Sequence, residues 1–375
     1  MNFDYNEEQQ LLADSVKRFI GKDYTFEARK KIVESDAGIS DSVWATFAEM
    51  GLLGLPVSAD FDGFGGSALD MMGVMESIGD GLVVEPFLAT TIGAQFVARG
   101  GSASLKKAVL PAVVAGKLKL AFAQSEKGAR YDLAHVATKA RKTDSGYVID
   151  GEKCVVVHGS CADKLVVSAR TSGGDKAKTG ISLFLVDAKA PGLTMKNYRT
   201  VDELRAADVT LTGVAVDADA LIGKEGKGLA LIEAVVDYAT ALICAEAVGA
   251  IKSANDATLE YLKTRKQFGV PIGAFQALQH RMVDMVISYE QAKSMACLAC
   301  DKVDSVKKAA ERKRFVSAAK VRVSEACRHV SQESIQLHGG MGMTEEMKVS
   351  HTFRRLTMLV QQFGDIDHHL ERFSG

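Results

Sequence analysis

The sequence lacks an excess of charge of either sign, with 46 lysines and arginines against 47 aspartates and glutamates. A protein that binds nucleic acid or an anionic membrane surface through its charge needs a basic patch. We therefore expect no nucleic-acid partner and no membrane partner. The 375 residues, 47% of them hydrophobic, provide ample apolar material for a core and allow two or three domains.

The sequence also lacks a recognisable targeting or membrane-spanning segment. Residues 1–8 are acidic, without the basic and apolar regions of a signal peptide or the arginine-rich pattern of a transit peptide. The most apolar helical stretch, residues 239–251, is interrupted by Glu246 and is too short to span a bilayer. A cytoplasmic location is expected.

Cysteines are few and scattered, and no secretory context supports a disulfide framework. Cys297 and Cys300 form a C-x-x-C pair inside a long helical pattern, with no second pair of ligands nearby. Packed small residues explain this pair better than a zinc or redox site. His368 and His369 lack a third ligand in the sequence, so we expect no metal site.

The hydrophobic pattern divides the chain into three blocks. Residues 1–118 are predicted to be helical, because apolar residues recur there at helical spacing. Asn6 and Gln9 have the spacing of a capping box. Asp41 is expected to cap a later helix, and Gly51 is expected to end it.

Residues 119–222 change to short runs rich in β-branched residues, separated by turn residues. Residues 143–146 predict a hairpin turn. Because no helix-length connection separates the runs, we predict an antiparallel β domain. The expected strands are residues 136–141, 146–150, 154–158, 164–170, 181–187 and 209–216.

Residues 223–375 return to helical spacing. Apolar residues between Phe275 and Ala296 recur every three or four positions, as in the seam of a helical bundle or coiled coil. The whole chain is therefore predicted to be an α+β protein with helical, β and helical blocks in that order.

A first candidate site follows the helix that is expected to end near Arg265. A Gly/Pro loop comes next, and another helix begins near residue 274. An arginine beside such a loop can offer a planar fork of donors to a pyrophosphate, and Phe268 could pack on an adenine or flavin ring. An ordinary helix-loop-helix with an exposed basic turn explains the same residues.

A second candidate site is the segment from Gln336 to Gly342. Its three glycines allow a ligand to approach the backbone closely, and Gln336 offers amide donors and acceptors. Taken alone this pattern is weak, because glycine-rich turns between helices are common.

Both motifs, in this order and in these blocks, resemble the acyl-CoA dehydrogenase family. The likeness covers nearly the whole chain, since residues 51–56 resemble the family's N-terminal segment and residues 146–153 its β-domain hairpin. Within the family, the ending at residues 363–370 resembles the small subunits of two-subunit enzymes such as pimeloyl-CoA dehydrogenase. The resemblance implies the family's fold, with a C-terminal four-helix-bundle domain.

The resemblance also implies FAD as the cofactor, an acyl-CoA substrate that is desaturated between Cα and Cβ, and an electron-transfer flavoprotein as electron acceptor. In the family, one FAD bridges two subunits, and one subunit holds the pyrophosphate and adenine of the other's flavin. The residues that match this nucleotide-holding half are Arg265, Phe268, Gln276, Gln336, Gly339 and Gly340.

The flavin-holding half of the resemblance is poor. The family's phosphate-contacting serine corresponds to Tyr131, within residues 125–132. Its Trp-Ile-Thr segment beside the flavin corresponds to residues 155–157, which are all valine. Valine has no side-chain donor for a flavin nitrogen or oxygen.

The catalytic base is missing at both places where the family carries it. The glutamate of the family's Y-E-G-T motif corresponds to Gly364, and the alternative position on the helix that opens the C-terminal domain corresponds to Ala239. Asp365 is a candidate base one residue further on, although its side chain is one methylene shorter than glutamate.

The sequence therefore predicts the non-catalytic subunit of an α2β2 acyl-CoA dehydrogenase, which supplies the ADP half of the FAD site to a catalytic large subunit. Two alternatives remain: a homomeric dehydrogenase that uses Asp365, and a FAD-free assembly or acyl-CoA-binding scaffold. The acyl group is left open among dicarboxylyl, steroid-derived and fatty acyl chains.

Overall fold

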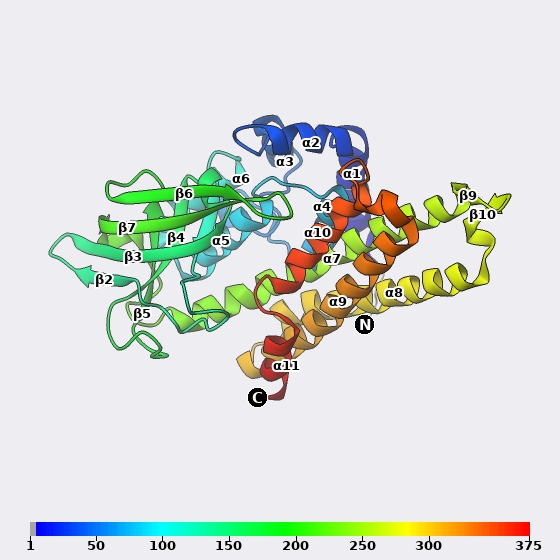
Figure 1. Ribbon diagram of the computed structural model, residues 1–375. Helices are drawn as coiled ribbons and strands as arrows, with labels where there is room; N and C mark the ends of the chain where they lie inside the picture. The colour runs from blue at the N-terminus through cyan, green and yellow to red at the C-terminus, as the bar shows by residue number, and fades with distance from the viewer. Residues whose placement is uncertain (1–4) are drawn as a thin grey trace. The chain divides into compact units, whose positions relative to one another are not determined.

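The computed structural model describes residues 5–375 (Figure 1). The start of the acidic N-terminal segment, residues 1–4, lies outside the described residues. The chain forms two compact units, each built from discontinuous segments. The bundle unit contains the described residues up to Lys31, together with Ser67–Val83 and Thr240–Gly375, and the sheet unit contains Ile32–Gly66 and Val84–Ala239. These units do not test the three sequence blocks, which stay a prediction.

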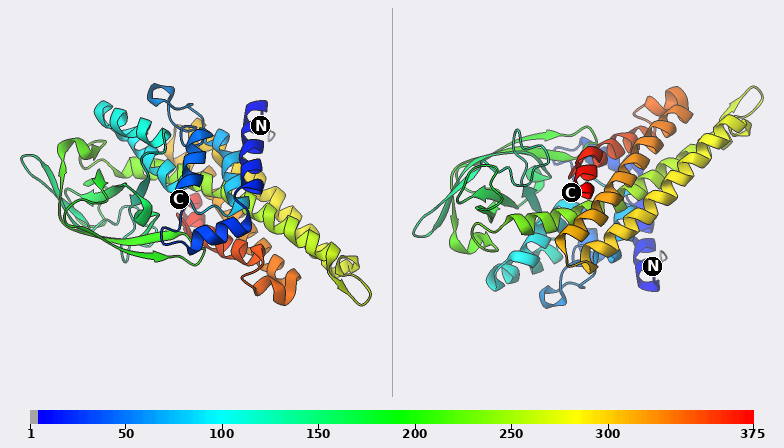
Figure 2. Two further views of the ribbon diagram at one scale, coloured as in Figure 1. Left: turned by 90° about the horizontal axis from the view of Figure 1, so that it is seen from above. Right: turned by 90° about the horizontal axis from the view of Figure 1, so that it is seen from below.

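The bundle unit is helical. Within it α8 and α9 run side by side as a long hairpin (Figures 1 and 2). Two helices, α2 (Phe26–Glu34) and α7 (Leu229–Thr264), continue across the boundary between the units. The other helices of the bundle unit are α1 (Glu7–Lys22), α4 (Ala68–Gly81), α8 (Gln276–Ser305), α9 (Ala309–His338), α10 (Lys348–Gln361) and α11 (Ile366–Ser374).

The apolar helix α7 is longer than the sequence analysis predicted. It has 36 residues, against the expected stretch at 239–251, and its most apolar window has a mean hydropathy of 1.6. Length and composition would let this helix cross a membrane, but 94% of that window is buried inside the protein. Its apolar surface is therefore core, as expected for a central helix of a globular protein.

Local capping signals explain where the first helices begin. The predicted capping box of Asn6 and Gln9 is confirmed at the start of α1. The next predicted cap was wrong by one residue, because Ser40 and not Asp41 accepts the capping hydrogen bond of α3 (Asp41–Glu49), from the Val43 N–H. Gly51 follows the end of α3 with a φ of +75°.

The sheet unit contains one eight-stranded sheet in the order β6-β7-β3-β2-β4-β5-β8, with β1 beside β4. The expectation of a purely antiparallel domain was wrong, because β1 pairs with β4 in parallel and β2 meets β4 in parallel at a single residue pair. The strands are β1 (Leu120–Ala123), β2 (Lys139–Lys142), β3 (Gly146–Val157), β4 (Lys164–Arg170), β5 (Ile181–Asp187), β6 (Leu193–Arg199), β7 (Arg205–Asp217) and β8 (Leu221–Ile222), and the helices beside them are α5 (Phe87–Gly100) and α6 (Ala103–Val114).

Strand β3 carries the local feature that matters for the site. The predicted strands at 146–150 and 154–158 are one strand, reached through the predicted hairpin turn, where the Thr143 N–H donates to the Gly146 carbonyl at 2.9 Å. Its register against β7 shifts between Lys153 and Val156, which leaves Cys154 and Val155 in a bulge. Bulges re-aim side chains, and this one lies where the family resemblance places a flavin contact.

Candidate cofactor-binding site

The first motif forms a tight hairpin at the end of α7. Strand β9 (Lys266–Gln267) pairs with β10 (Val270–Pro271), and the two turn residues, Phe268 and Gly269, have φ of +54° and +80°. Positive φ at both central positions is a type I′ turn, a conformation that phenylalanine rarely adopts. The Phe268 side chain is nevertheless 91% exposed. The chain therefore holds an apolar ring in solvent at a conformational cost.

Arg265 lies between α7 and this hairpin. Its backbone N–H donates to the Tyr261 carbonyl at 2.8 Å, and its carbonyl accepts from the Ile272 N–H at 2.8 Å, so the main chain is held on both sides. Its guanidinium is exposed and makes no hydrogen bond or ion pair with any residue that the structure describes. A fixed arginine with a free fork of donors is suited to an anionic ligand.

The second motif lies where α9 ends. Helix α9 ends at His338, and the 3-10 turn Gly339–Met343 follows. Gly339 has φ +58° and ψ −143°, and a Cβ atom on Gly339 or Gly340 would meet no other atom within 4 Å. Gln336 is exposed on the last turn of α9. The backbone at these glycines is therefore open to close approach by a ligand.

A stacked pair of rings brings the two motifs together. The rings of Tyr261 on α7 and His338 on α9 lie with centroids 4.5 Å apart and planes at 29°. His338 is buried, its Nδ1 donates to the Ser334 carbonyl at 2.7 Å, and burial lowers the pKa of its imidazole. Each ring lies within four residues of a motif residue, yet the sequence analysis assigned neither a role.

The exposed groups of the two motifs match what the nucleotide half of FAD requires. The exposed guanidinium supplies a cation, and the exposed aromatic ring supplies a surface for stacking. The open glycine backbone allows a ligand to approach the main chain closely. Gln276, the first residue of α8, is exposed beside them. The residues present fit an adenine nucleotide with a pyrophosphate. We call residues 265–276 and 336–340 the two clamp segments.

Gly364, at the position expected for the catalytic base, has no room for a side chain. Its φ is +123°, and a Cβ atom there would lie 2.5 Å from Cδ2 of His368 and 2.7 Å from Nε2 of His369. Non-glycine residues rarely adopt this φ. A glutamate at position 364 would need both a different backbone and displaced histidines.

A buried lysine fixes the chain around this position. The Nζ of Lys320 donates to the carbonyls of Leu359, Val360 and Gly364, each at 2.9 Å. Burial lowers the pKa of this amine, and its three donors are matched by three main-chain acceptors. The sequence analysis missed Lys320, although it lies between Val316 and Val323 at the spacing of an apolar helix face.

The other candidate base positions are also accounted for. Asp365 caps α11, and its Oδ1 accepts from the His368 N–H at 2.9 Å. The carboxylate is therefore directed at a helix N-terminus, where it complements the helix dipole. Ala239 is fully buried within α7 and has no ionisable group.

In the sheet unit, a buried ion pair holds the segment that follows β1. The Nζ of Lys153 lies 2.6 Å from Oε1 of Glu126 and donates to Ser168 Oγ at 2.9 Å. The carboxylate also accepts from the N–H groups of Ala137 and Thr138. Burial opposes ionisation of Glu126, but Lys153 and these donors outweigh it and lower the pKa of the carboxyl. The segment after β1, which corresponds to the family's flavin-side segment, is thus held in place by this ion pair and these hydrogen bonds.

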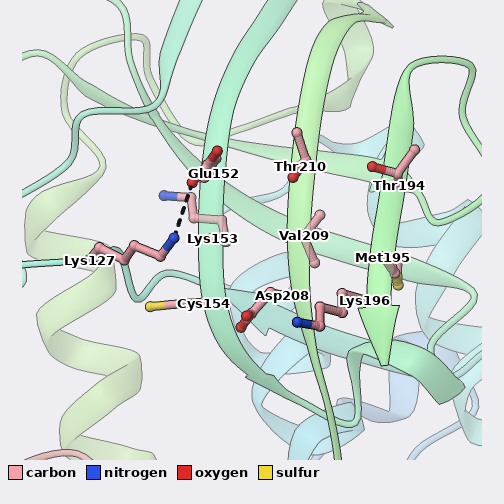
Figure 3. A pocket seen from close by; sticks show the side chains of 10 residues that line it. All are labelled: Lys127, Glu152, Lys153, Cys154, Thr194, Met195, Lys196, Asp208, Val209 and Thr210. Carbon is pink, nitrogen blue, oxygen red and sulfur yellow. Dashed lines mark ion pairs between the residues drawn. The ribbon is translucent and has the colours of Figure 1, made fainter. Parts of the chain in front are cut away.

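The surface beside that segment does not fit a flavin ring. The bulge residue Val155 has a φ of +51° and is 49% exposed, and its N–H donates to Asp208 Oδ1 at 3.1 Å. Next to it is a pocket of about 360 Å³ on the face of β3, β7 and β6 (Figure 3). Charged side chains from these strands line it, and Lys127 reaches Glu152 across it at 3.8 Å. Of its lining residues only Cys154, Met195 and Val209 are apolar, which is a small apolar wall for a three-ring isoalloxazine.

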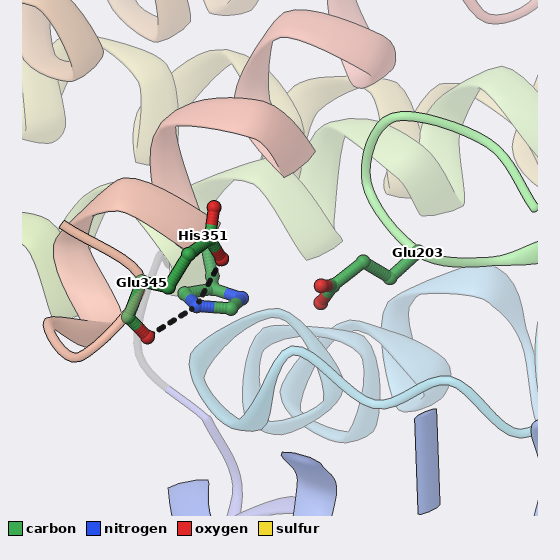
Figure 4. A group of neighbouring side chains, drawn as sticks. All are labelled: Glu203, Glu345 and His351. Carbon is green, nitrogen blue, oxygen red and sulfur yellow. Dashed lines mark hydrogen bonds and ion pairs between the residues drawn. The ribbon is translucent and has the colours of Figure 1, made fainter. Parts of the chain in front are cut away.

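His351 in the bundle unit lies near acidic side chains but has protein partners at both ring nitrogens. Figure 4 shows His351 with Glu345, whose Oε2 lies 3.3 Å from Nε2 of the imidazole. Nδ1 lies 2.9 Å from a guanidinium nitrogen of Arg354 and 3.4 Å from one of Arg29, so it accepts, and Nε2 carries the proton. Since both ring nitrogens are engaged, a metal ion would have to displace these partners. Glu203, drawn in the same figure, belongs to the sheet unit.

A helical region, a β region and a second helical region follow one another along this chain, and comparison with known families identifies the class of protein that has this fold. The model of the acyl-CoA dehydrogenase N-terminal domain matches residues 6–117, that of the middle domain 121–214, and that of the C-terminal domain 226–371. The chain belongs to the acyl-CoA dehydrogenase family. Its α+β fold, with helical, β and helical regions, is therefore confirmed.

Individual relatives match this chain along nearly its full length. "Probable acyl-CoA dehydrogenase YngJ" of Bacillus subtilis (strain 168) is 30% identical over 94% of this chain and 93% of its own. The solved structure of PigA with FAD and proline superposes with a TM-score of 0.91, 27% identity and coverage of 100% and 98%. The ChsE4-ChsE5 complex from Mycobacterium tuberculosis gives a TM-score of 0.90, 25% identity and coverage of 100% and 98%.

Proposed function

We propose that this chain is the non-catalytic subunit of a heteromeric FAD-dependent acyl-CoA dehydrogenase. It supplies the ADP half of the FAD site, through the two clamp segments, to a catalytic large subunit. The observation that carries this proposal is the contrast between the residues that would hold the nucleotide and the position expected for the catalytic base. Arg265, Gly339 and Gly340 are open and ready for a nucleotide, whereas the base position at Gly364 is sterically closed.

The reaction of the complex is the α,β-desaturation of an acyl-CoA thioester. When bound, FAD would supply the acceptor for the hydride that leaves Cβ, and a carboxylate of the catalytic subunit would take the proton from Cα. This chain contributes binding and orientation. The Arg265 guanidinium would pair with the pyrophosphate, the Phe268 ring would pack on the adenine or flavin ring, and the side-chain amides of Gln276 and Gln336 would complete the nucleotide contacts.

An exposed apolar face on α8 supports a subunit partner. Val283, Val286 and Ile287 are 55%, 44% and 48% exposed and lie on neighbouring turns of the helix whose first residue is Gln276. Exposed apolar residues grouped on one helix face mark a contact surface. The ChsE4-ChsE5 relative is itself a complex of two different chains. An α2β2 assembly, an electron-transfer flavoprotein as acceptor and a cytoplasmic location complete the proposal.

Two competing functions are weaker on the same observations. A homomeric dehydrogenase needs Asp365 as its base, yet that carboxylate caps α11. A FAD-free scaffold would gain nothing from the exposed Phe268, which is held at positive φ.

Purification of this chain alone, and together with the acyl-CoA dehydrogenase subunit proposed as its partner, tests the proposal. The chain alone is expected to retain little FAD and to turn over no acyl-CoA thioester. The co-expressed complex is expected to hold a single FAD per heterodimer and to be active with at least one of a dicarboxylyl, steroid-derived or fatty acyl-CoA. Stoichiometric FAD and turnover from this chain alone would refute the proposal.

A further inference from the structure

The two clamp segments lie at the open end of a long helical hairpin. Helices α8 and α9 have 30 residues each and are joined at residues 306–308. The clamp segments are at the other end, where α8 begins and α9 finishes, about 45 Å along the helix axis at 1.5 Å per residue. The connecting loop therefore cannot set the distance between the clamp segments.

An ion pair crosses this open end. Nε of Arg281 donates to Oε2 of Glu333 at 2.6 Å, and Nη2 donates to Oε1 at 3.0 Å. The contact is a fork-to-fork arrangement, which fixes direction as well as distance. Arg281 lies five residues after Gln276 on α8, and Glu333 lies three residues before Gln336 on α9. Each partner is thus within about two helical turns of a clamp residue.

Further along the hairpin, α8 and α9 remain in contact. Met282, Met285, Ala292 and Ala296 of α8 are buried. The Ser288 hydroxyl and His329 Nδ1 cross between the helices at 2.9 Å. Because this seam persists without the ion pair, loss of the pair would free the open end without unfolding the hairpin.

The pair also has an electrostatic consequence. Without Arg281, the Glu333 carboxylate would stand as a bare negative charge about one helical turn from Gln336, where the proposed ligand carries its pyrophosphate. Arg281 itself is bound by Glu333, whose hydrogen bond raises the pKa of the guanidinium. The guanidinium is thereby committed to the carboxylate.

We propose that Arg281 and Glu333 are positioning residues that set the spacing of the two clamp segments and so control how firmly the complex holds FAD. This inference rests on the proposed function, because it takes the clamp segments as the site of the nucleotide. It assigns to an ion pair between two helices a role in cofactor retention, without contact between either side chain and the cofactor.

The test uses the assembled heteromeric complex and measures the dissociation constant of FAD by fluorescence. Arg281→Met and Glu333→Gln are each expected to weaken FAD binding about three- to tenfold. The exchanged pair, Arg281→Glu with Glu333→Arg, is expected to return binding to within about twofold of the wild type. Assembly and the thermal unfolding of the FAD-free complex should stay unchanged, which a purely structural role would not allow.

Two outcomes would overturn the inference. If Arg281 bound the phosphates directly, Arg281→Met would weaken binding while Glu333→Gln left it unchanged or tightened it. If the exchanged pair failed to restore binding in an assembled complex, coupling between the two side chains would be refuted. Glu325→Gln is the matched control, because it removes the exposed intrahelical pair of Glu325 with Arg322 on the same helix and should change nothing.

Failure of the inference can be told apart from failure of the proposed function. If Arg265→Ala releases FAD but the Arg281 and Glu333 variants do not, only the positioning role falls. If Arg265→Ala also keeps its FAD, the clamp itself is misassigned.

Discussion

The buried amino group of Lys320 donates a hydrogen bond to the carbonyl of Gly364, 2.9 Å away, at the position where the family resemblance places the catalytic glutamate. His369 reinforces the same corner, since its Nε2 lies 3.1 Å from the Phe363 carbonyl and its Nδ1 lies 3.1 Å from Ser317 Oγ. The segment that would carry a base is thus fixed by hydrogen bonds from buried side chains.

Restoring the missing glutamate should therefore not restore catalysis. Gly364→Glu is expected to give a less stable chain with no turnover alone, because its Cβ would overlap the rings of His368 and His369 and its φ would be strained. Turnover is measured with the acyl-CoA panel, and stability by urea unfolding. Gly364→Ala, which carries the strain without the carboxylate, is the matched control. Turnover by the glutamate variant alone would show that the position is still catalytically competent.

Asp365 is predicted to act through the helix it caps. Asp365→Asn should leave the complex fully active, because asparagine caps a helix as well as aspartate does. Asp365→Ala should lower the free energy of unfolding by about 0.5–2 kcal/mol, also without loss of activity. Both are checked by urea unfolding of the chain and steady-state turnover of the complex. An inactive complex with the asparagine variant would favour Asp365 as a base.

His369 should make stability dependent on pH. Burial, followed by the charges of Lys320, Arg372 and His368, lowers the pKa of His369 to about 2 in the folded chain. The unfolded imidazole titrates near 6.5, so the unfolded state takes up the proton first as pH falls. This contribution to stability is present above about pH 6.5 and is lost below it, by up to about 1.4 kcal/mol per pH unit.

Urea unfolding between about pH 7.5 and about pH 5.5 checks this linkage. His369→Gln keeps a donor and an acceptor but does not titrate, so its stability should fall less steeply with decreasing pH than that of the wild type. His280→Gln is the control, because His280 is exposed on α8. Equal slopes for the wild type and His369→Gln would contradict the prediction.

Structural features that join residues close together in the chain could be predicted from the sequence. The capping box of Asn6 and Gln9 and the turn at 143–146 involve residues three positions apart, so their chemistry is visible in the sequence. The parallel contact of β1 with β4 joins residues more than forty positions apart, and no local pattern encodes it. Lys320 is a further case, since its acceptors lie about forty residues away.

The candidate site divides in the same way. Arg265 and Gly339 were predicted as site residues because their two motifs together resemble the family's, and their role in binding FAD stays a prediction. The stacking of Tyr261 on His338 and the pairing of Arg281 with Glu333 could not be predicted, because they depend on how α7, α8 and α9 pack. The exposed groups that a ligand could contact were thus named from the sequence, whereas the contacts that hold them in place were not.

Removal of the Tyr261 ring should loosen the clamp. Tyr261→Leu loses the stack on His338 that links α7 to α9, and aromatic pairs of this kind are worth about 0.5–1.5 kcal/mol. FAD should therefore dissociate about two- to tenfold faster from the complex. Tyr261→Phe keeps the ring and should release FAD at the wild-type rate. The rate is followed by the rise in flavin fluorescence after dilution, and faster release from the phenylalanine variant would implicate the hydroxyl instead.

The sharpest test of the nucleotide clamp is the charge of Arg265. Arg265→Ala should weaken FAD binding to the complex about 10- to 100-fold, because a pyrophosphate loses its charge-assisted hydrogen bonds. Arg265→Lys should recover only part of that loss, since an ammonium keeps the charge without the planar fork. Arg18→Ala is the matched control, because Arg18 is an exposed arginine on α1, which contains no residue of either clamp segment. FAD content is measured per heterodimer by absorbance after gel filtration. Wild-type FAD content in Arg265→Ala would mean that FAD retention does not depend on this guanidinium, although it has no other partner among the described residues.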